Sequence, residues 1–102
     1  MATEKQQFTD VQKAMGITHQ EFYAKLPLLL DAIPYHQVKD GIHFQLNHKN
    51  VEIILGSEKN RELGPSIKLP VTCVTLRFFD CSTEEVNGFI EHFNRTFLKG
   101  GG

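Results

Sequence analysis

The sequence predicts a two-layer α+β domain, in which an antiparallel meander of three to four strands carries N-terminal and C-terminal helices on one face. Three observations predict it. The 102 residues are enough for a single core, and a composition of 40% hydrophobic and 23% charged residues is typical of globular proteins. Apolar and polar residues alternate over 42–46 and 71–79, as in half-buried strands. Helical spacing follows Thr18 and Ser82, so helices flank the strands and favour a layered architecture.

The chain begins and ends with segments that we expect to be flexible. Residues 1–8 predict a flexible lead-in, 9–99 a single domain, and 100–102 a flexible glycine tail. Within the domain, Asp10 can cap a short helix over 11–15, and Gly16 can end that helix in a left-handed conformation.

A clearer helix follows. Thr18 and Glu21 have the spacing of a capping box, which pairs each side chain with the other residue's backbone N–H. Helical spacing then relates Phe22, Leu26, Leu29 and Ile33. Pro27 lacks a backbone donor and crowds the preceding turn, so we expect a kink or a second start there, and Pro34 ends the helix.

The next segments predict a strand meander. Asp40-Gly41 between 35–38 and 42–46 is a strong hairpin turn signal. A turn centred on these two residues would place His36 opposite Gln45. A second turn over 47–50 leads to a third strand over 51–55.

Residues 56–70 contain Gly64-Pro65, Pro70 and several charges, and predict a long loop with or without a short edge strand near 67–69. The strand over 71–79 should direct Val74, Leu76 and Phe78 towards the helices. The last helix begins at a second capping box, Ser82 with Glu85. Its apolar stripe consists of Val86, Phe89, Ile90, Phe93 and Phe97.

Charge and hydropathy argue against several classes of protein. Lys and Arg total 11 and Asp and Glu total 12, so no general electrostatic footprint for nucleic acid or anionic lipid is present. The start lacks the apolar region of a signal peptide, and no apolar run is long enough for a bilayer, so we expect a cytoplasmic protein without membrane contact. In that compartment Cys73 and Cys81 should be free thiols.

Residues 11–26 resemble the turn region of a helix-turn-helix DNA-binding motif. Gly16, Ile17, Thr18 and Phe22 match its turn, cap and packing positions, whereas Gln12 stands where the family usually has a small residue. The resemblance implies DNA binding through this segment. Ordinary helix packing explains the same residues, and Lys25 is the only strong phosphate contact nearby, so nucleic acid is a minor alternative.

The titratable residues form no recognisable catalytic set and imply no cofactor. His36, His43 and His48 lack the spacing of a metal site and are expected to be solvated. Cys81 precedes a helix, where the dipole could lower the pKa of its thiol, but the same position suits a small apolar residue in a hydrophobic staple.

Cations gather near the predicted loop. Arg61, Lys68 and Arg77 could form an anion site if the loop bends, or they could simply be solvated. The terminal Gly101 and Gly102 resemble those of ubiquitin-like sulphur carriers and modifiers, although those proteins begin with a hairpin. A flexible tail explains these glycines equally well.

The leading hypothesis is therefore a non-catalytic protein-binding or accessory module that contacts a protein through the outer sheet face, the 56–70 loop and the glycine tail. Ile54, Cys73 and Phe79 should be exposed on the outer sheet face, where a protein partner or a second copy in a homodimer could cover them. The alternative from another class is a small enzyme or ligand carrier, with a pocket between the kinked helix and the sheet. Its polar contacts would be Tyr23, Tyr35, His36 and Arg77.

Overall fold

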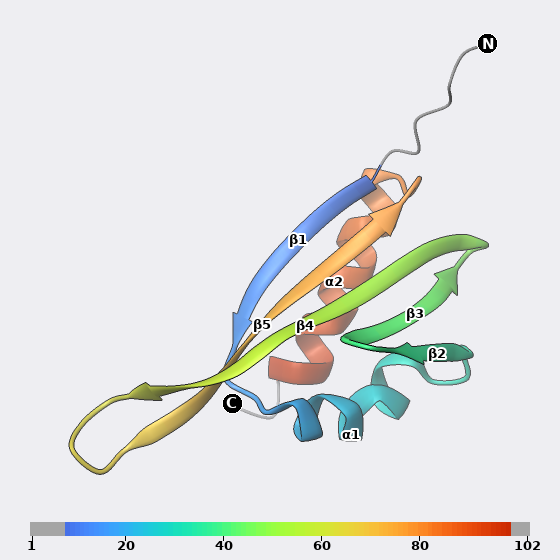
Figure 1. The fold of residues 1–102 in the computed structure, drawn as a ribbon. Helices are drawn as coiled ribbons and strands as arrows, with labels where there is room; N and C mark the ends of the chain where they lie inside the picture. The colour runs from blue at the N-terminus through green and yellow to red at the C-terminus, as the bar shows by residue number, and fades with distance from the viewer. Residues whose placement is uncertain (1–7, 99–102) are drawn as a thin grey trace.

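The structure is a computed structural model that describes residues 8–98. A five-stranded antiparallel sheet in the order β1-β5-β4-β3-β2 carries two helices on one side (Figure 1). The elements are β1 (Phe8–Met15), α1 (His19–Leu30), β2 (Tyr35–Val38), β3 (Gly41–Leu46), β4 (Lys49–Glu62), β5 (Lys68–Phe79) and α2 (Thr83–Leu98). The predicted α+β architecture is confirmed, but the sheet has one strand more than the three to four expected.

The additional strand is β1, and the short helix predicted over 11–15 is wrong. β1 pairs antiparallel with β5 along its whole length, from Phe8 opposite Phe79 to Met15 opposite Thr72. Met15 is buried against the core, whereas Gln12 points to solvent. Residues such as Gln, Lys and Ala favour helices locally, and here the free edge of β5 overrides that weak preference. The first helix of the helix-turn-helix resemblance is therefore absent, and Phe8 belongs to a strand rather than to a lead-in.

α1 begins as predicted. The backbone N–H of Glu21 donates to the Thr18 hydroxyl at 3.0 Å, and the backbone N–H of Thr18 donates to the Glu21 carboxylate at 2.8 Å. The helix runs without a second start through Pro27 and ends at Leu30, because Asp31 adopts a φ of 54°. Ile33 therefore lies beyond the helix rather than in it.

The β2–β3 hairpin has a different register from the predicted one. Its turn residues are Lys39 and Asp40, while Gly41 lies in β3 opposite Val38. The cause is close contact with β4, since a Cβ on Gly41 would stand 1.9 Å from the Ile53 carbonyl oxygen. Glycine is needed here for backbone approach rather than for the turn. As a result His36 lies opposite His43 and not opposite Gln45.

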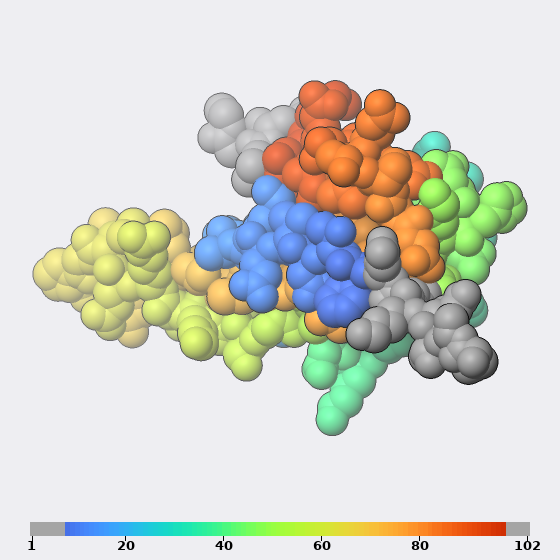
Figure 2. Space-filling model, turned by 90° about the horizontal axis from the view of Figure 1, so that it is seen from above, coloured from blue at the N-terminus to red at the C-terminus, as the bar shows by residue number. Residues whose placement is uncertain are grey.

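The loop predicted over 56–70 is mostly a β-hairpin. A bulge between Leu55 and Glu58 interrupts the β4–β5 ladder, which then continues to Glu62 opposite Lys68. Pairing of two strands satisfies their backbone hydrogen bonds even where the side chains are exposed to solvent. Such strands need no apolar face, so their polar composition gave no sign of a strand. We call residues 58–71, the part of this hairpin beyond the bulge, the arm; it projects from the rest of the molecule (Figures 1 and 2).

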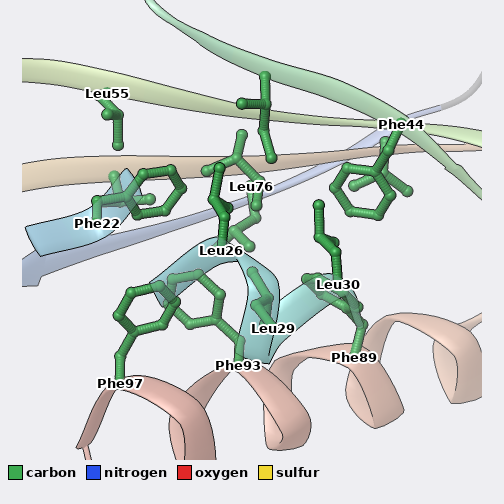
Figure 3. Close-up of a cluster of buried hydrophobic side chains, with 14 of the residues drawn as sticks. Phe22, Leu26, Leu29, Leu30, Phe44, Leu55, Leu76, Phe89, Phe93 and Phe97 are labelled. Carbon is green, nitrogen blue, oxygen red and sulfur yellow. The ribbon is translucent and has the colours of Figure 1, made fainter. Parts of the chain in front are cut away.

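The core lies between the inner face of the sheet and both helices (Figure 3). Phe93 is fully buried, and its ring centroid lies 4.6 Å from that of Phe97. The Phe97 ring in turn stacks on Phe22 of α1 at 5.5 Å. Strand residues Val74 and Leu76 are also fully buried, which confirms the predicted meeting of the α2 stripe with β5.

The capping box at the start of α2 is confirmed and is joined by an ion pair. The Glu85 carboxylate accepts from the backbone N–H of Ser82 and from the Lys49 ammonium, both at 2.8 Å. The Lys49 hydrogen bond first, and the Ser82 N–H second, lower the pKa of Glu85 to about 2. This carboxylate thereby ties the β3–β4 turn to the helix.

Replacing Glu85 by glutamine should flatten the acid dependence of stability. A carboxylate with a pKa of about 2 in the folded state and 4.5 as its ordinary value stabilises the fold above pH 4.5. That contribution is lost as the pH falls through about 2, so the melting temperature of the native chain should drop more steeply over this window than that of Glu85→Gln. Thermal melts followed by circular dichroism between pH 7 and pH 2 measure the difference. The control is Glu91→Gln, which removes an exposed pair with Arg95; equal slopes for native and Glu85→Gln chains would contradict the expectation.

Candidate functional site

A row of polar side chains crosses the outer face of the sheet, with one member on each strand. The cross-strand register places these residues side by side, in the order Asp10, Arg77, Glu52, His43 and His36. The helices cover the opposite face, so this row is open to solvent on one side (Figure 1).

Arg77 is held firmly within this row. Its guanidinium donates to both carboxylate oxygens of Asp10, at 2.8 and 2.9 Å, and lies 5.1 Å from the centroid of the Phe8 ring. The Arg77 hydrogen bond lowers the pKa of Asp10. Bidentate pairs of this kind fix both partners, so Arg77 acts as a connection between β5 and the edge strand β1.

The structure does not gather the three predicted anion-binding residues. Arg61 and Lys68 both lie on the arm, where Lys68 pairs with Glu62 in the ladder. Arg77 lies near the other end of β5, roughly 30 Å from Lys68 at about 3.3 Å per residue. The prediction of a shared anion site assumed that residues 56–70 form a loop that can bend. The β-hairpin that they form instead keeps Arg61 and Lys68 away from Arg77.

The predicted partner surface is divided. Ile54, Cys73 and Phe79 all belong to the outer face, with Cys73 exposed and the other two half-buried. The Asp10–Arg77 pair lies between Phe79 and the other two in the register. Phe79 instead neighbours Phe8, whose ring centroid is 6.0 Å away and which is 56% exposed. The outer face thus offers two small apolar areas rather than one.

Three histidines line a shallow depression at the β2 edge of the sheet. The rings of His36 and His43 are nearly parallel, with centroids 6.5 Å apart, and His48 lines the same depression of about 520 Å³. Sequence spacing missed this pair because it depends on the register that Gly41 sets. Among residues 8–98, no group of three or more His, Cys, Asp or Glu side chains is arranged to hold a metal ion.

Both cysteines are free thiols, and Cys81 is not activated. Burial, followed by the nearby Glu85 carboxylate, raises the pKa of Cys81. Cys81 packs against the core, which agrees with the alternative of a small apolar residue in a hydrophobic staple. His92 is also engaged, since its Nε2 donates to the Leu29 carbonyl at 2.8 Å and joins α2 to α1.

Side chains fill the space between the sheet and the first turns of α1. Phe22 and Leu26 are fully buried there, so this end of the helix leaves no room for a ligand (Figure 3). Tyr23 packs edge-on against Phe22, and Arg77 lies on the opposite face of the sheet. The polar contacts expected of the predicted ligand pocket therefore do not converge.

The arm is anchored at its base. His19 Nε2 donates to the Gly56 carbonyl at 2.6 Å, and the backbone N–H of His19 donates to the Glu58 carboxylate at 2.7 Å. The buried Thr72 hydroxyl donates to the Ile17 carbonyl at 2.7 Å. These bonds connect the bulge and β5 to the segment between β1 and α1, and thereby set the direction in which the arm leaves the sheet.

Beyond its base the arm pairs with no other strand of the described chain. β1 reaches only Thr72 on one side, and β3 reaches only Ile54 on the other. Three apolar side chains near the tip are exposed: Leu63 at 54%, Ile67 at 55% and Leu69 at 46%. The arm contributes to an elongated shape with principal extents of 60 × 29 × 24 Å (Figure 2).

A groove lies on the helical side of the molecule. It consists of two adjoining depressions of about 330 and 560 Å³ that share Leu46, Phe89 and His92. Its remaining lining comes from Leu29, Leu30, Asp31, Ala32, Ile33, Pro34, Gln45, Asn47, Glu84, Glu85 and Gly88. The groove thus has a largely apolar floor, and its charged lining residues are acidic. Its walls come from α1, the α1–β2 connection, β3 and α2. The ligand-carrier alternative places a pocket between this helix and the sheet, but none of its four expected polar contacts lines the groove.

Over the residues that the structure describes, no helix combines the length and apolar character needed to cross a membrane. Comparison of the chain with protein families, with curated proteins and with solved structures finds no significant match to any of them.

Proposed function

We propose that this protein is a non-catalytic protein-binding module that engages its partner through the arm. The observation that carries the proposal is the exposure of Leu63, Ile67 and Leu69 on a ribbon that stands clear of the domain. Burying one such side chain fully contributes about 1.5–3 kcal/mol relative to leaving it exposed. The isolated domain gains little from these residues, whereas a complex that covers them would gain a substantial fraction of its affinity.

The backbone of the arm supports the same function. Its two outer edges have no neighbouring strand in the described chain, and unpaired edges can add a strand from another protein. Charged residues and proline are the usual protection against indiscriminate pairing, and the arm carries Lys59, Arg61 and Pro70. This combination suits an edge that stays soluble until a specific partner binds.

The outer sheet face remains a secondary contact in this proposal. Ile54, Cys73 and Phe79 are accessible there, but the two apolar areas that they mark are small.

The glycine tail at 100–102 lies outside the described residues. The groove beside α1 lacks the polar contacts of the enzyme or ligand-carrier alternative, and DNA binding through 11–26 lacks its first helix, so the arm is the better-supported site.

The test removes the apolar character of the tip without disturbing the fold. The triple variant Leu63→Ser, Ile67→Ser, Leu69→Ser should bind its protein partner at least tenfold more weakly, since loss of only 1.4 kcal/mol has that effect. Quantitative affinity capture from the source cells, together with sedimentation velocity to detect a second copy, measures the loss.

The matched control is Leu28→Ser, which changes an apolar side chain that is 68% exposed on α1, away from the arm. It should retain the native binding. Equal recovery of every partner by the triple variant, or equal loss with Leu28→Ser, would contradict a role for the arm.

A further inference from the structure

We propose that the partner of the arm is a second copy of this chain, whose groove receives the arm in a head-to-tail contact. This inference rests on the proposed function, because it names the occupant that the arm binds. Both halves of the contact are present on one molecule: an apolar tip at one end, and an apolar groove elsewhere on the same chain.

The two surfaces are complementary in charge. The arm carries three cations, Lys59, Arg61 and Lys68, and two anions, Glu58 and Glu62, of which Glu58 is engaged at the base by the His19 backbone N–H. The groove is lined by the acidic residues Asp31, Glu84 and Glu85. Lys49 neutralises part of this charge through its ion pair with Glu85, and His92 also lines the groove. Opposite charges around an apolar centre direct association and fix its orientation.

The geometry requires a second molecule. Leu46 in the groove lies beside Lys49 at the start of β4, whereas the arm begins at Glu58 and follows that 14-residue strand to its end at Glu62. At about 3.3 Å per residue the base of the arm is roughly 30 Å from Lys49, and the end of the strand is roughly 40 Å away. The anchored base directs the arm away from the body, so that it cannot fold back into its own groove (Figure 1).

Charge also favours this contact over a symmetric pairing of two arms. Arm–arm pairing would bring together the cations of both copies, whereas arm–groove contact places them beside carboxylates. A head-to-tail contact is heterologous, so it generates an open chain or a closed ring rather than a simple two-fold dimer.

The decisive experiment is mixing of two disabled variants. The arm variant Leu63→Asp, Ile67→Asp retains the groove, and the groove variant Gly88→Arg retains the arm. A side chain at Gly88 meets open space, since no atom lies within 4 Å of its Cβ position, so Gly88→Arg should fold and place a cation in the groove. Asn87→Arg is the control, because it adds the same charge at an exposed neighbour that does not line the groove.

Sedimentation velocity from micromolar to millimolar concentration should show self-association of the native chain and of Asn87→Arg. Each disabled variant alone should associate at least tenfold more weakly. An equimolar mixture should form a dimer that grows no further, because one intact arm then meets one intact groove. High salt should weaken the assembly by screening its charges.

Three outcomes would overturn the inference: a native chain that stays monomeric throughout, a groove variant that associates as the native chain does, or a mixture that does not form the dimer. If the native chain is monomeric but captures another protein through Leu63, Ile67 and Leu69, the proposed function stands and only the second copy is wrong. If capture does not depend on these residues, the proposed function itself fails.

Discussion

Replacing Gly41 by alanine should destabilise the domain by about 3 kcal/mol or more, at the upper end of the cost of overpacking. A Cβ at this position would stand 1.9 Å from the Ile53 carbonyl oxygen and 2.9 Å from the Ile53 carbonyl carbon. Both are backbone atoms of the neighbouring strand, so no side-chain rotation can relieve the contact. β3 must move away from β4, and the edge strand β2 loses its place in the sheet with it.

Urea unfolding followed by circular dichroism measures this loss as a lower midpoint. Gly88→Ala is the matched control, because nothing lies within 4 Å of its Cβ position. Glycine within a helix costs about 0.5–1 kcal/mol relative to alanine, so the same substitution at Gly88 should raise the midpoint. Native-like stability for Gly41→Ala would show that the strands do not approach as closely as described.

Replacing Phe93 by alanine should destabilise the domain by about 3–5 kcal/mol, the range for truncating a buried aromatic ring. The Phe93 side chain is fully buried on α2, and the rings of Phe97 and Phe89 lie 4.6 and 6.5 Å away. Its removal opens a cavity in the core between the helices and the sheet (Figure 3). Domains of this size have a total stability of about 5–15 kcal/mol, so this variant should be close to unfolding at ordinary temperature.

Phe93→Leu provides the comparison, since volume-conserving apolar exchanges usually cost less than about 1.5 kcal/mol. The free energies of unfolding of the two variants should therefore differ by about 2 kcal/mol or more, a difference that thermal melts and urea titrations resolve. If Phe93→Ala were as stable as Phe93→Leu, the ring would not fill the core as the structure describes.

The elements that could be predicted well are those with local causes. The two capping boxes each depend on residues three positions apart, and both form with the expected hydrogen bonds. The stripe of α2 and the alternation of β5 likewise follow from the periods of a helix and a strand. Such signals are complete within a few residues, so no distant partner can reverse them.

The interpretations that failed depended on distant partners. Residues 10–15 are a strand because β5 offers them a free edge, and residues 58–62 are a strand because residues 68–72 pair with them. Gly41 was taken as a turn residue, although it serves the contact with Ile53. This error moved the partner of His36 by two residues, from His43 to Gln45, and so hid the His36–His43 pair.

The candidate surfaces show the same difference between local and long-range causes. Sequence alone supplied the chemistry of the outer face, including the exposure of Cys73 and the cations of the arm, but it placed Arg61 and Lys68 with Arg77 in one site. In the structure Arg61 and Lys68 lie on the arm, at the opposite end of the β4–β5 hairpin from Arg77, which pairs with Asp10 instead.

The amino-acid sequence by itself therefore determined the α+β class, the two helix starts and the apolar faces that meet in the core. Tertiary structure alone decided the fifth strand, the hairpin register, the projecting arm and the groove. The physical reason is range: caps and periodic faces arise from neighbours along the chain, whereas strand pairing and grooves arise from residues that only folding brings together.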